Sequence, residues 1–147
     1  MNPNVKPSDR ATLLAVINPQ SATTAKSSGW VAAKDFLSFL ATVAVGTISA
    51  SGTVDAKLEQ AKDASGTSAK DIPSKAITQL TQAGTDSDKQ VEINLQQADL
   101  DINAGYTHFR LTITPATAAA LIAGTVRGFD ALYQPAADAT TVDEVVG

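Results

Sequence analysis

The sequence predicts an all-β protein, an antiparallel β-sandwich, and three observations lead to this fold class. Apolar residues recur at every second position in short runs such as "VDAKLEQ" and "FRLTIT", which is the spacing of half-buried strands. Clusters of Gly, Pro, Ser and Asp interrupt these runs at short intervals, as turns between strands do. Long helical segments do not alternate with the strands, which argues against a doubly wound α/β sheet.

In the first part of the chain we expect a strand over Ala11–Asn18 that ends at Pro19. A loop or weak edge strand should follow it. Trp30–Ala50 is long enough for two strands or for one bent strand, and Lys34 and Asp35 would mark the bend.

The segment Gly52–Gly66 presents a conflict between helix and strand. Its Ala, Lys, Leu, Glu and Gln residues have high helix propensity. However, Val54, Ala56 and Leu58 alternate with charged residues, as a half-buried strand requires. We therefore predict a strand, paired in a hairpin with the apolar run before it.

The polar stretch 64–89 has no role that we can assign, and it contains a short strand around Ala76–Leu80 or one turn of helix. After it, alternation predicts three more strands, within Lys89–Asn103, Tyr106–Thr114 and Ala118–Tyr133. The residues expected to face inward are Val91, Ile93, Leu95, Phe109, Leu111 and Ile113. Those expected to face outward include His108, Arg110 and Thr112.

Length and composition indicate one domain with a core of small and β-branched side chains. The chain has 147 residues with 26 Ala and 17 Thr but 5% aromatic residues, so burial stabilises it less per residue and association with neighbouring subunits would help. We expect an extended N-terminal arm over residues 1–10, a sandwich over 11–134 and an acidic tail over 135–147.

Charge and cysteine content exclude several classes of function. The net charge is −4 and basic residues are scattered singly, so we expect no direct nucleic-acid binding. The absence of cysteine excludes disulfides, thiolate catalysis and cysteine metal sites. The N-terminus lacks the apolar core of a secretory signal, and the apolar run Phe36–Ala50 is too short to span a membrane. We expect a soluble protein with no membrane partner.

The stretch "DLDINAG", Asp99–Gly105, places oxygen ligands at its first, third and fifth positions, as a calcium loop does. An EF-hand loop also needs glycine at position six and glutamate at position twelve, where this chain has Ala104 and Arg110. We therefore interpret Asn103-Ala104-Gly105 as a turn. A weak calcium site at Asp99, Asp101 and Asn103 is the alternative.

No pattern typical of an active site is found, and we predict that the protein is not an enzyme and has no cofactor. His108 is the single histidine, and we interpret it as a solvated or interface residue rather than a general base. Asp55 and Glu59 flank Lys57 on one strand face, where a salt-bridged surface is a simpler explanation than a glycosidase pair. Trp30 packs at a sandwich edge or anchors a ligand or partner.

With these residues in view, the chain resembles small virion structural proteins of tailed bacteriophages. The resemblance covers roughly 28–128 and consists of the order of four segments: "GWVAAKDFLSFLATVAVGTISASG", "VDAKLEQ", "YTHFRLTIT" and "AAALIAGTVRG". It implies a β-sandwich, often of jelly-roll type, at the head shell or at a head or tail junction, with no catalytic residues. The long polar loop 64–89 departs from this pattern.

The version that we favour is a head decoration or cement protein that clamps major-capsid subunits and forms a homo-oligomer on the virion. Unpaired strand edges are natural sites for pairing with another chain. The candidate partner-binding residues are Asn2, Pro3, Val5, Pro7 and Trp30. The alternatives are a head–tail junction or tail protein, and a carbohydrate- or receptor-binding module built on Trp30, Tyr106 and Tyr133.

Overall fold

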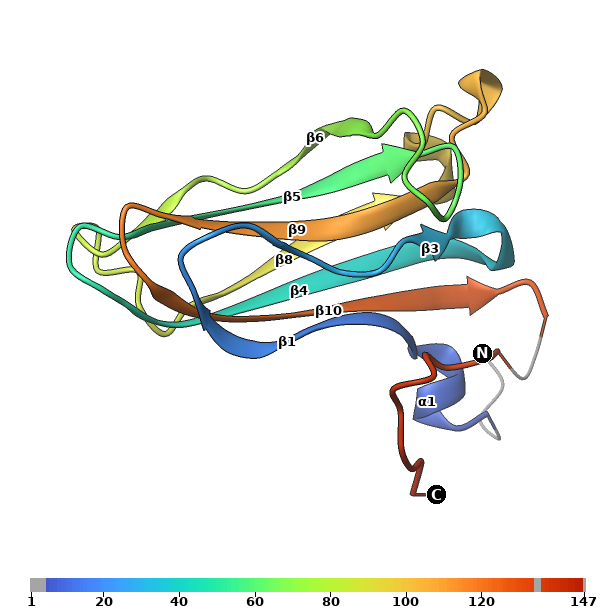
Figure 1. Cartoon of the computed structure of the whole chain (residues 1–147). Coiled ribbons are helices and arrows are strands. Elements are labelled where there is room, and N and C mark those ends of the chain that lie inside the picture. The colour runs from blue at the N-terminus through green and yellow to red at the C-terminus, as the bar shows by residue number, and fades with distance from the viewer. Residues whose placement is uncertain (1–4, 134–135, 147) are drawn as a thin grey trace.

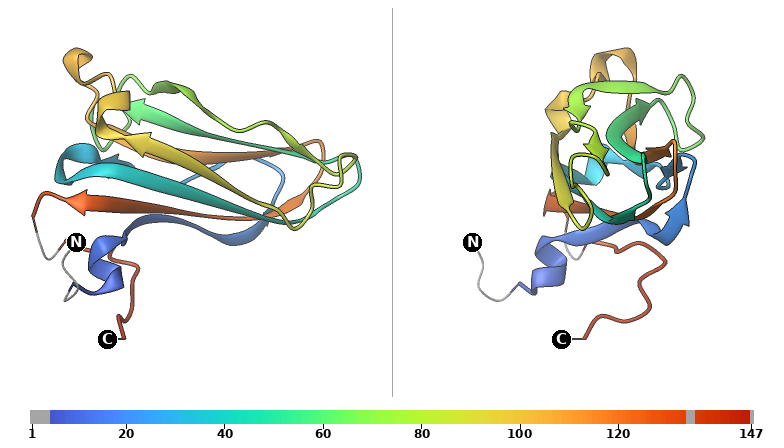
Figure 2. Two further views of the ribbon diagram at one scale, coloured as in Figure 1. Left: turned by 180° about the vertical axis from the view of Figure 1, so that it is seen from behind. Right: turned by 90° about the vertical axis from the view of Figure 1, so that its left-hand side faces the viewer.

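The computed structural model describes residues 5–133 and 136–146, and it confirms an all-β fold of two antiparallel sheets. The two sheets face each other across a shared core, which is clearest in the end-on view of Figure 2. Residues 1–4, 134, 135 and 147 lie outside the described residues.

The first sheet, called sheet A below, has the strand order β1-β10-β4-β8 (Figure 1). Its strands are β1 (Thr12–Ala22), β4 (Phe36–Ile48), β8 (Gln90–Gln96) and β10 (Ala120–Ala131). The predicted strands within 36–50, 89–103 and 118–133 are thus confirmed.

The second sheet, sheet B, has the order β2-β9-β5-β6, with β3 also paired to β9 and β7 to β5. Its strands are β2 (Lys26–Ser27), β3 (Val31–Ala32), β5 (Thr53–Ala61), β6 (Lys70–Ala76), β7 (Leu80–Thr81) and β9 (His108–Ala116). The choice of strand over helix for 52–66 is confirmed, since β5 pairs with β9 along its whole length.

The core lies between the sheets and consists of the inward residues of the alternating runs. Val54, Leu58 and Phe109 are fully buried, and the Phe39 and Phe109 rings meet edge to face across the sandwich at 4.6 Å between centroids. Such aromatic pairs add specific geometry to the area that they bury. The inward positions predicted on β8 and β9 are confirmed, although Val91 is half-buried.

Two strand boundaries differ from the prediction because both strands contain proline at a sheet edge. β1 does not end at Pro19 but continues to Ala22, with a register shift between Ile17 and Gln20. β6 includes Pro73 and precedes the site where we expected a short strand, at 76–80. Proline lacks an N–H but leaves no ladder bond unmade at an edge, and β1 and β6 are the outermost strands of their sheets.

Among the described residues, one short helix precedes β1, and three 3-10 turns connect strands. They are α1 (Pro7–Arg10) and the 3-10 turns η1 (Ala33–Asp35), η2 (Gln97–Asp99) and η3 (Ile102–Ala104). η1 lies between β3 and β4, so the predicted bend at Lys34 and Asp35 is confirmed. Residues 7–10, predicted as part of an extended arm, form one helical turn instead, with proline at its first position.

The C-terminal segment contacts the outer edge of β1. The Leu13 N–H donates to Asp138 Oδ1 at 3.0 Å, and the Ala139 N–H donates to the Leu13 carbonyl at 2.7 Å. The segment therefore occupies part of an edge that would otherwise present unpaired main-chain groups.

Candidate functional site

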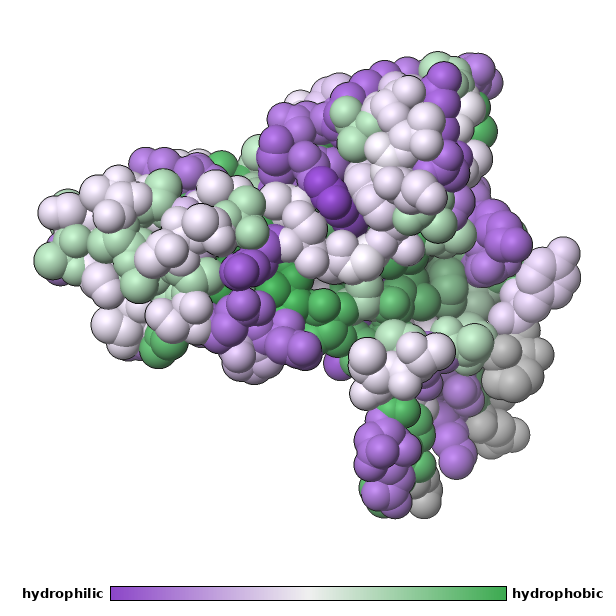
Figure 3. Space-filling view, viewed as in Figure 1, coloured by the Kyte–Doolittle hydropathy of each residue, from purple (hydrophilic) through white to green (hydrophobic). Residues whose placement is uncertain are grey.

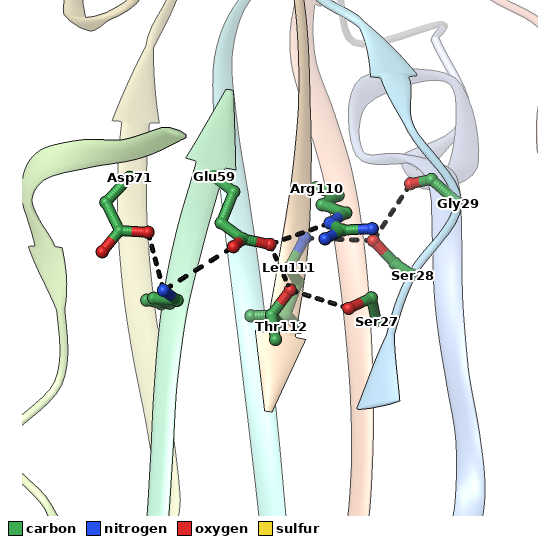
Figure 4. Close-up of polar contacts among 9 residues, drawn as sticks. Ser27, Ser28, Gly29, Glu59, Asp71, Arg110, Leu111 and Thr112 are labelled. Atoms are coloured by element: carbon green, nitrogen blue, oxygen red, sulfur yellow. Dashed lines mark hydrogen bonds and ion pairs between the residues drawn. The ribbon is translucent and has the colours of Figure 1, made fainter. Parts of the chain in front are cut away.

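A network of charged and hydroxyl side chains crosses the outer face of sheet B (Figure 4). Its centre is Glu59, whose Oε2 accepts hydrogen bonds from Arg110 Nε at 2.8 Å and from the Thr112 hydroxyl at 2.7 Å. Strands β5 and β9 place these residues side by side, because Glu59 and Arg110 are register partners. Cross-strand pairs of opposite charge are a common means of stabilising such a face.

The network reaches β6 on one side and β2 on the other. Lys57 Nζ lies 3.6 Å from Glu59 and 2.7 Å from Asp71 on β6. The Ser27 and Thr112 hydroxyls are 2.8 Å apart. Thr112, predicted to face solvent, is only 6% exposed, because Ser27 and the carboxylate of Glu59 cover it.

The hydrogen bonds of Glu59 control its protonation. Burial by itself would raise the pKa of this carboxyl, but the bonds from Thr112 and Arg110 outweigh burial and hold the pKa below its ordinary value. Glu59 is therefore a stably charged acceptor. A general acid would need the opposite shift, so the proximity of Arg110 supports the salt-bridged explanation of this face.

Asp55, the other carboxylate considered for a glycosidase pair, is not part of this network. It accepts a hydrogen bond from Gln79 Nε2 at 2.7 Å. The ring of His108 is hydrogen-bonded through Nδ1 to the Thr107 hydroxyl, at 2.9 Å. Asp55 and Glu59 are therefore held by different hydrogen-bond partners on the face of sheet B.

Trp30 joins the polar network to the end of the sandwich. The Arg110 guanidinium lies over its ring, 4.5 Å from the centroid, a cation–π geometry. A Cβ atom added to Gly66, which has a φ of +83°, would fall 2.8 Å from Trp30 Nε1. Trp30 therefore packs against Arg110 and Gly66, and its role as an anchor for a ligand or partner stays a prediction.

Trp30 also lines a pocket of about 400 Å³ at the end of the sandwich where η1 lies. The pocket walls are mainly apolar and include Leu14, Phe36 and Tyr133. Tyr133 is 79% exposed, and Figure 3 shows hydrophobic residues in a hollow near β3. The fold thus brings together two aromatic residues that are far apart in sequence.

Tyr106, the third aromatic residue considered for sugar stacking, lies elsewhere. Its ring has Lys70 Nζ at 4.2 Å and Lys62 Nζ at 5.7 Å from the centroid. Its hydroxyl donates to the Ser68 carbonyl at 3.1 Å. Tyr106 therefore belongs to the packing of the loops around β5 and β6.

The stretch that resembled a calcium loop forms a turn. Gly105 has a left-handed φ of 87° at the end of η3, which glycine adopts without strain. Asp99 accepts from the Gln96 N–H at 2.8 Å and contacts Lys75 at 2.9 Å, while Asp101 pairs with Lys70 at 2.8 Å. Residues 5–133 and 136–146 contain no group of three His, Asp or Glu side chains that could hold a metal.

The backbone N–H of Gln96, followed by the ammonium of Lys75, holds the pKa of Asp99 below its ordinary value. The two carboxylates of this stretch thus pair with different lysines, Asp99 with Lys75 and Asp101 with Lys70.

Of the candidate arm residues, Asn2 and Pro3 lie outside the described residues. Val5 precedes α1, and Pro7 is its first residue. The structure brings neither of them to Trp30: α1 packs on β1 and β10, whereas Trp30 lies over Arg110 on β9.

The outer face of sheet A was not identified from the sequence as a candidate surface. Its central residues are Leu40, Thr42 and Ala44 on β4, paired with Arg127, Thr125 and Ala123 on β10. The charged residues of its four strands are Glu92, Arg127 and Asp130. The signal for this face was present in the sequence as a run from 36 to 50 without charge.

No family model matches this chain, and no curated protein matches it in sequence. In the part of the chain that the structure describes, no helix has the length and apolar character required to cross a membrane.

Proposed function

We propose that this chain is a non-enzymatic structural protein of a tailed-phage particle, a head decoration or cement protein that binds and stabilises the major-capsid shell. The observation that carries the proposal is the strand order. β2 and β3 both pair with β9, and β6 and β7 both pair with β5. When each of these pairs is counted as one strand, the sheets have the orders 1-8-3-6 and 2-7-4-5.

This order is that of a jelly roll, and jelly rolls are common in viral capsid proteins. It agrees with the resemblance of the sequence to small virion proteins, so we propose the jelly roll as the fold. The paired charges of sheet B also support a structural role, because a surface that satisfies its own polar groups adds stability rather than chemistry.

The shell contact that we propose uses the N-terminal arm, residues 1–6, and free strand edges. β8 is an outer strand of sheet A and presents main-chain groups to which a shell segment can add. The acidic tail already occupies the β1 edge at Leu13, which leaves β8 as the better site. Such a protein resides in the virion and makes no direct contact with nucleic acid.

The test is mass spectrometry and cryo-EM of particles from the phage whose genome encodes the chain. We expect the chain in many copies on the outer shell, and a lower dissociation temperature for shells that lack it. A variant without residues 1–6 should bind depleted shells more weakly. Density at a head–tail junction or on the tail would identify one of the alternative virion roles, and absence from the particle would contradict the proposal.

A carbohydrate-binding module is the second candidate, and the pocket shared by Trp30 and Tyr133 favours it. Aromatic faces stack on sugar rings, and jelly rolls also occur in lectins. Asp35, which also lines the pocket, is a carboxylate able to accept hydrogen bonds from hydroxyl groups.

Glycan-array binding tests this candidate with three variants. Tyr133→Ala should abolish binding without affecting folding, because the side chain is largely exposed, and Trp30→Ala should do the same at some cost in stability. Leu121→Ala, at an exposed position outside the pocket, is the control. No binding by the wild type, or equal loss in all three variants, would reject the module.

A further inference from the structure

The outer face of sheet A carries no charge at its centre. Leu40, Thr42 and Ala44 on β4 are half-buried and point away from the core, and the neighbouring positions Ala123 and Thr125 on β10 do the same. Four of these five side chains, those of Thr42, Ala44, Ala123 and Thr125, are short. Such a surface can approach another sheet at the spacing of about 10 Å found in sandwiches.

Two opposite charges border this centre on either side of β4. Glu92 on β8 is the register partner of Thr42, and Arg127 on β10 is the partner of Leu40. The two charges therefore lie one strand to each side of β4 and two residues apart along it, about 7 Å at the usual rise of a strand.

We infer that this face binds the same face of a second copy of the chain. The two copies are related by a two-fold axis that lies between the two faces and runs parallel to β4. A rotation about such an axis places β10 of one copy over β8 of the other. Arg127 of each copy then faces Glu92 of its partner copy, and the pair forms twice. A two-fold interface requires this reciprocity: when a residue of the first copy contacts a residue of the second, the same two residues also meet with the copies exchanged.

The remaining geometry is compatible with this arrangement. Sheets packed face to face keep their strands within about 30° of each other, and an arginine side chain spans the offset along the strands. Arg127 Nη1 donates to the Ala11 carbonyl at 2.9 Å, which leaves further guanidinium donors for a carboxylate. In Figure 2, α1 and the C-terminal segment lie at one end of this sheet, where α1 contacts β1 and β10.

The second copy is a better occupant than an unrelated partner because the charge pattern is complementary to itself. The outer face of sheet B offers no comparable site, since Glu59 and Arg110 on that face pair with each other. The inference concerns the purified chain and does not depend on the proposed virion function.

Sedimentation velocity and light scattering on the full chain test the inference. We expect a species of twice the 15.1 kDa of one chain. Glu92→Arg and Arg127→Glu should each weaken the dimer by about tenfold or more, because like charges then meet twice. The double variant, in which the charges are exchanged, should restore the wild-type dissociation constant.

Asp55→Arg is the matched control, since it makes the same acid-to-arginine change on the outer face of sheet B. It should leave the mass unchanged, and circular dichroism should show that every variant keeps its strands. A wild-type monomer at concentrations up to about 1 mM, the range of the weakest specific complexes, would overturn the inference. A dimer that ignores Glu92→Arg, or that the double variant fails to restore, would overturn it as well.

Discussion

The outer faces of the two sheets have opposite characters although both cover the same core. The face of sheet B contains Lys57, Glu59 and Arg110, and their charges are joined by contacts of 2.8 to 3.6 Å. The face of sheet A presents Leu40 and Thr42 in the corresponding central position, with charge confined to its flanks.

The difference separates surface that stabilises the fold from surface that is free for association. On sheet B, Glu59, Arg110 and Thr112 bond to one another within the chain, so removing one leaves a partner unsatisfied. On sheet A, the outward side chains have few polar partners to lose, and a change there should alter contacts between molecules more than folding.

The largest effect is expected where the two faces share their core. Phe109→Ala removes a fully buried ring that packs on Phe39, and it should lower the free energy of unfolding by about 3–5 kcal/mol. Urea denaturation followed by circular dichroism measures this. Phe129→Ala, at a half-buried outer position of sheet A, is the control and should cost clearly less. Equal losses would contradict the assignment of inner and outer positions.

The same substitution on both outer faces compares them directly. Thr112→Val removes a hydroxyl that contacts Glu59 and Ser27, and it should destabilise the protein by about 1–3 kcal/mol. Thr42→Val, at the centre of the face of sheet A, should change the free energy of unfolding by less than about 0.5 kcal/mol. If both variants lost the same stability, the faces would not differ as described.

The sequence predicts the inner positions well because the period of two is a property of each strand alone. It predicts Leu58 and Ile93 as core residues and Gly105 as part of a turn. Strand alternation and turn formation both depend on residues that are close together in the sequence. The identity of edge strands depends on tertiary pairing, which is why β1 was expected to end at Pro19. Thr112 was expected outside because nothing local indicates that Ser27 covers it.

The candidate surfaces depended even more on long-range arrangement. Trp30 and Tyr133 were identified as aromatic candidates, but their shared pocket requires the C-terminal segment to return beside β3. Arg127 and Glu92 belong to strands separated by β4, so their arrangement on one face appears only after the sheet order is known.

Acidification provides a third comparison of the faces. The pKa of Glu59 is lowered in the folded protein, so its charge stabilises the fold above the ordinary value of 4.5, and this contribution is lost as the pH falls through the folded pKa. Glu59→Gln should cost about 1–2 kcal/mol at neutral pH, and the difference from wild type should shrink below pH 4.5. Denaturation at a series of pH values measures this difference. Asp130→Asn on sheet A, which removes a carboxylate with only an exposed hydrogen bond to Ser38, is the control and should change the free energy of unfolding little. A constant difference for Glu59→Gln would contradict the linkage.

The smallest change in the free energy of unfolding is expected at an ion pair exposed to solvent. Lys70 and Asp101 are 2.8 Å apart, but both side chains are more than two-fifths exposed, so water screens their attraction. Asp101→Asn should leave the free energy of unfolding unchanged within the error of a denaturant titration.

The same variant tests the calcium alternative, because Asp99 and Asp101 each have a lysine partner that a cation would have to displace. We expect millimolar calcium to leave the melting temperature of both proteins unchanged. A calcium-dependent rise in the wild type that Asp101→Asn abolishes would show instead that these carboxylates leave their lysines to bind the metal.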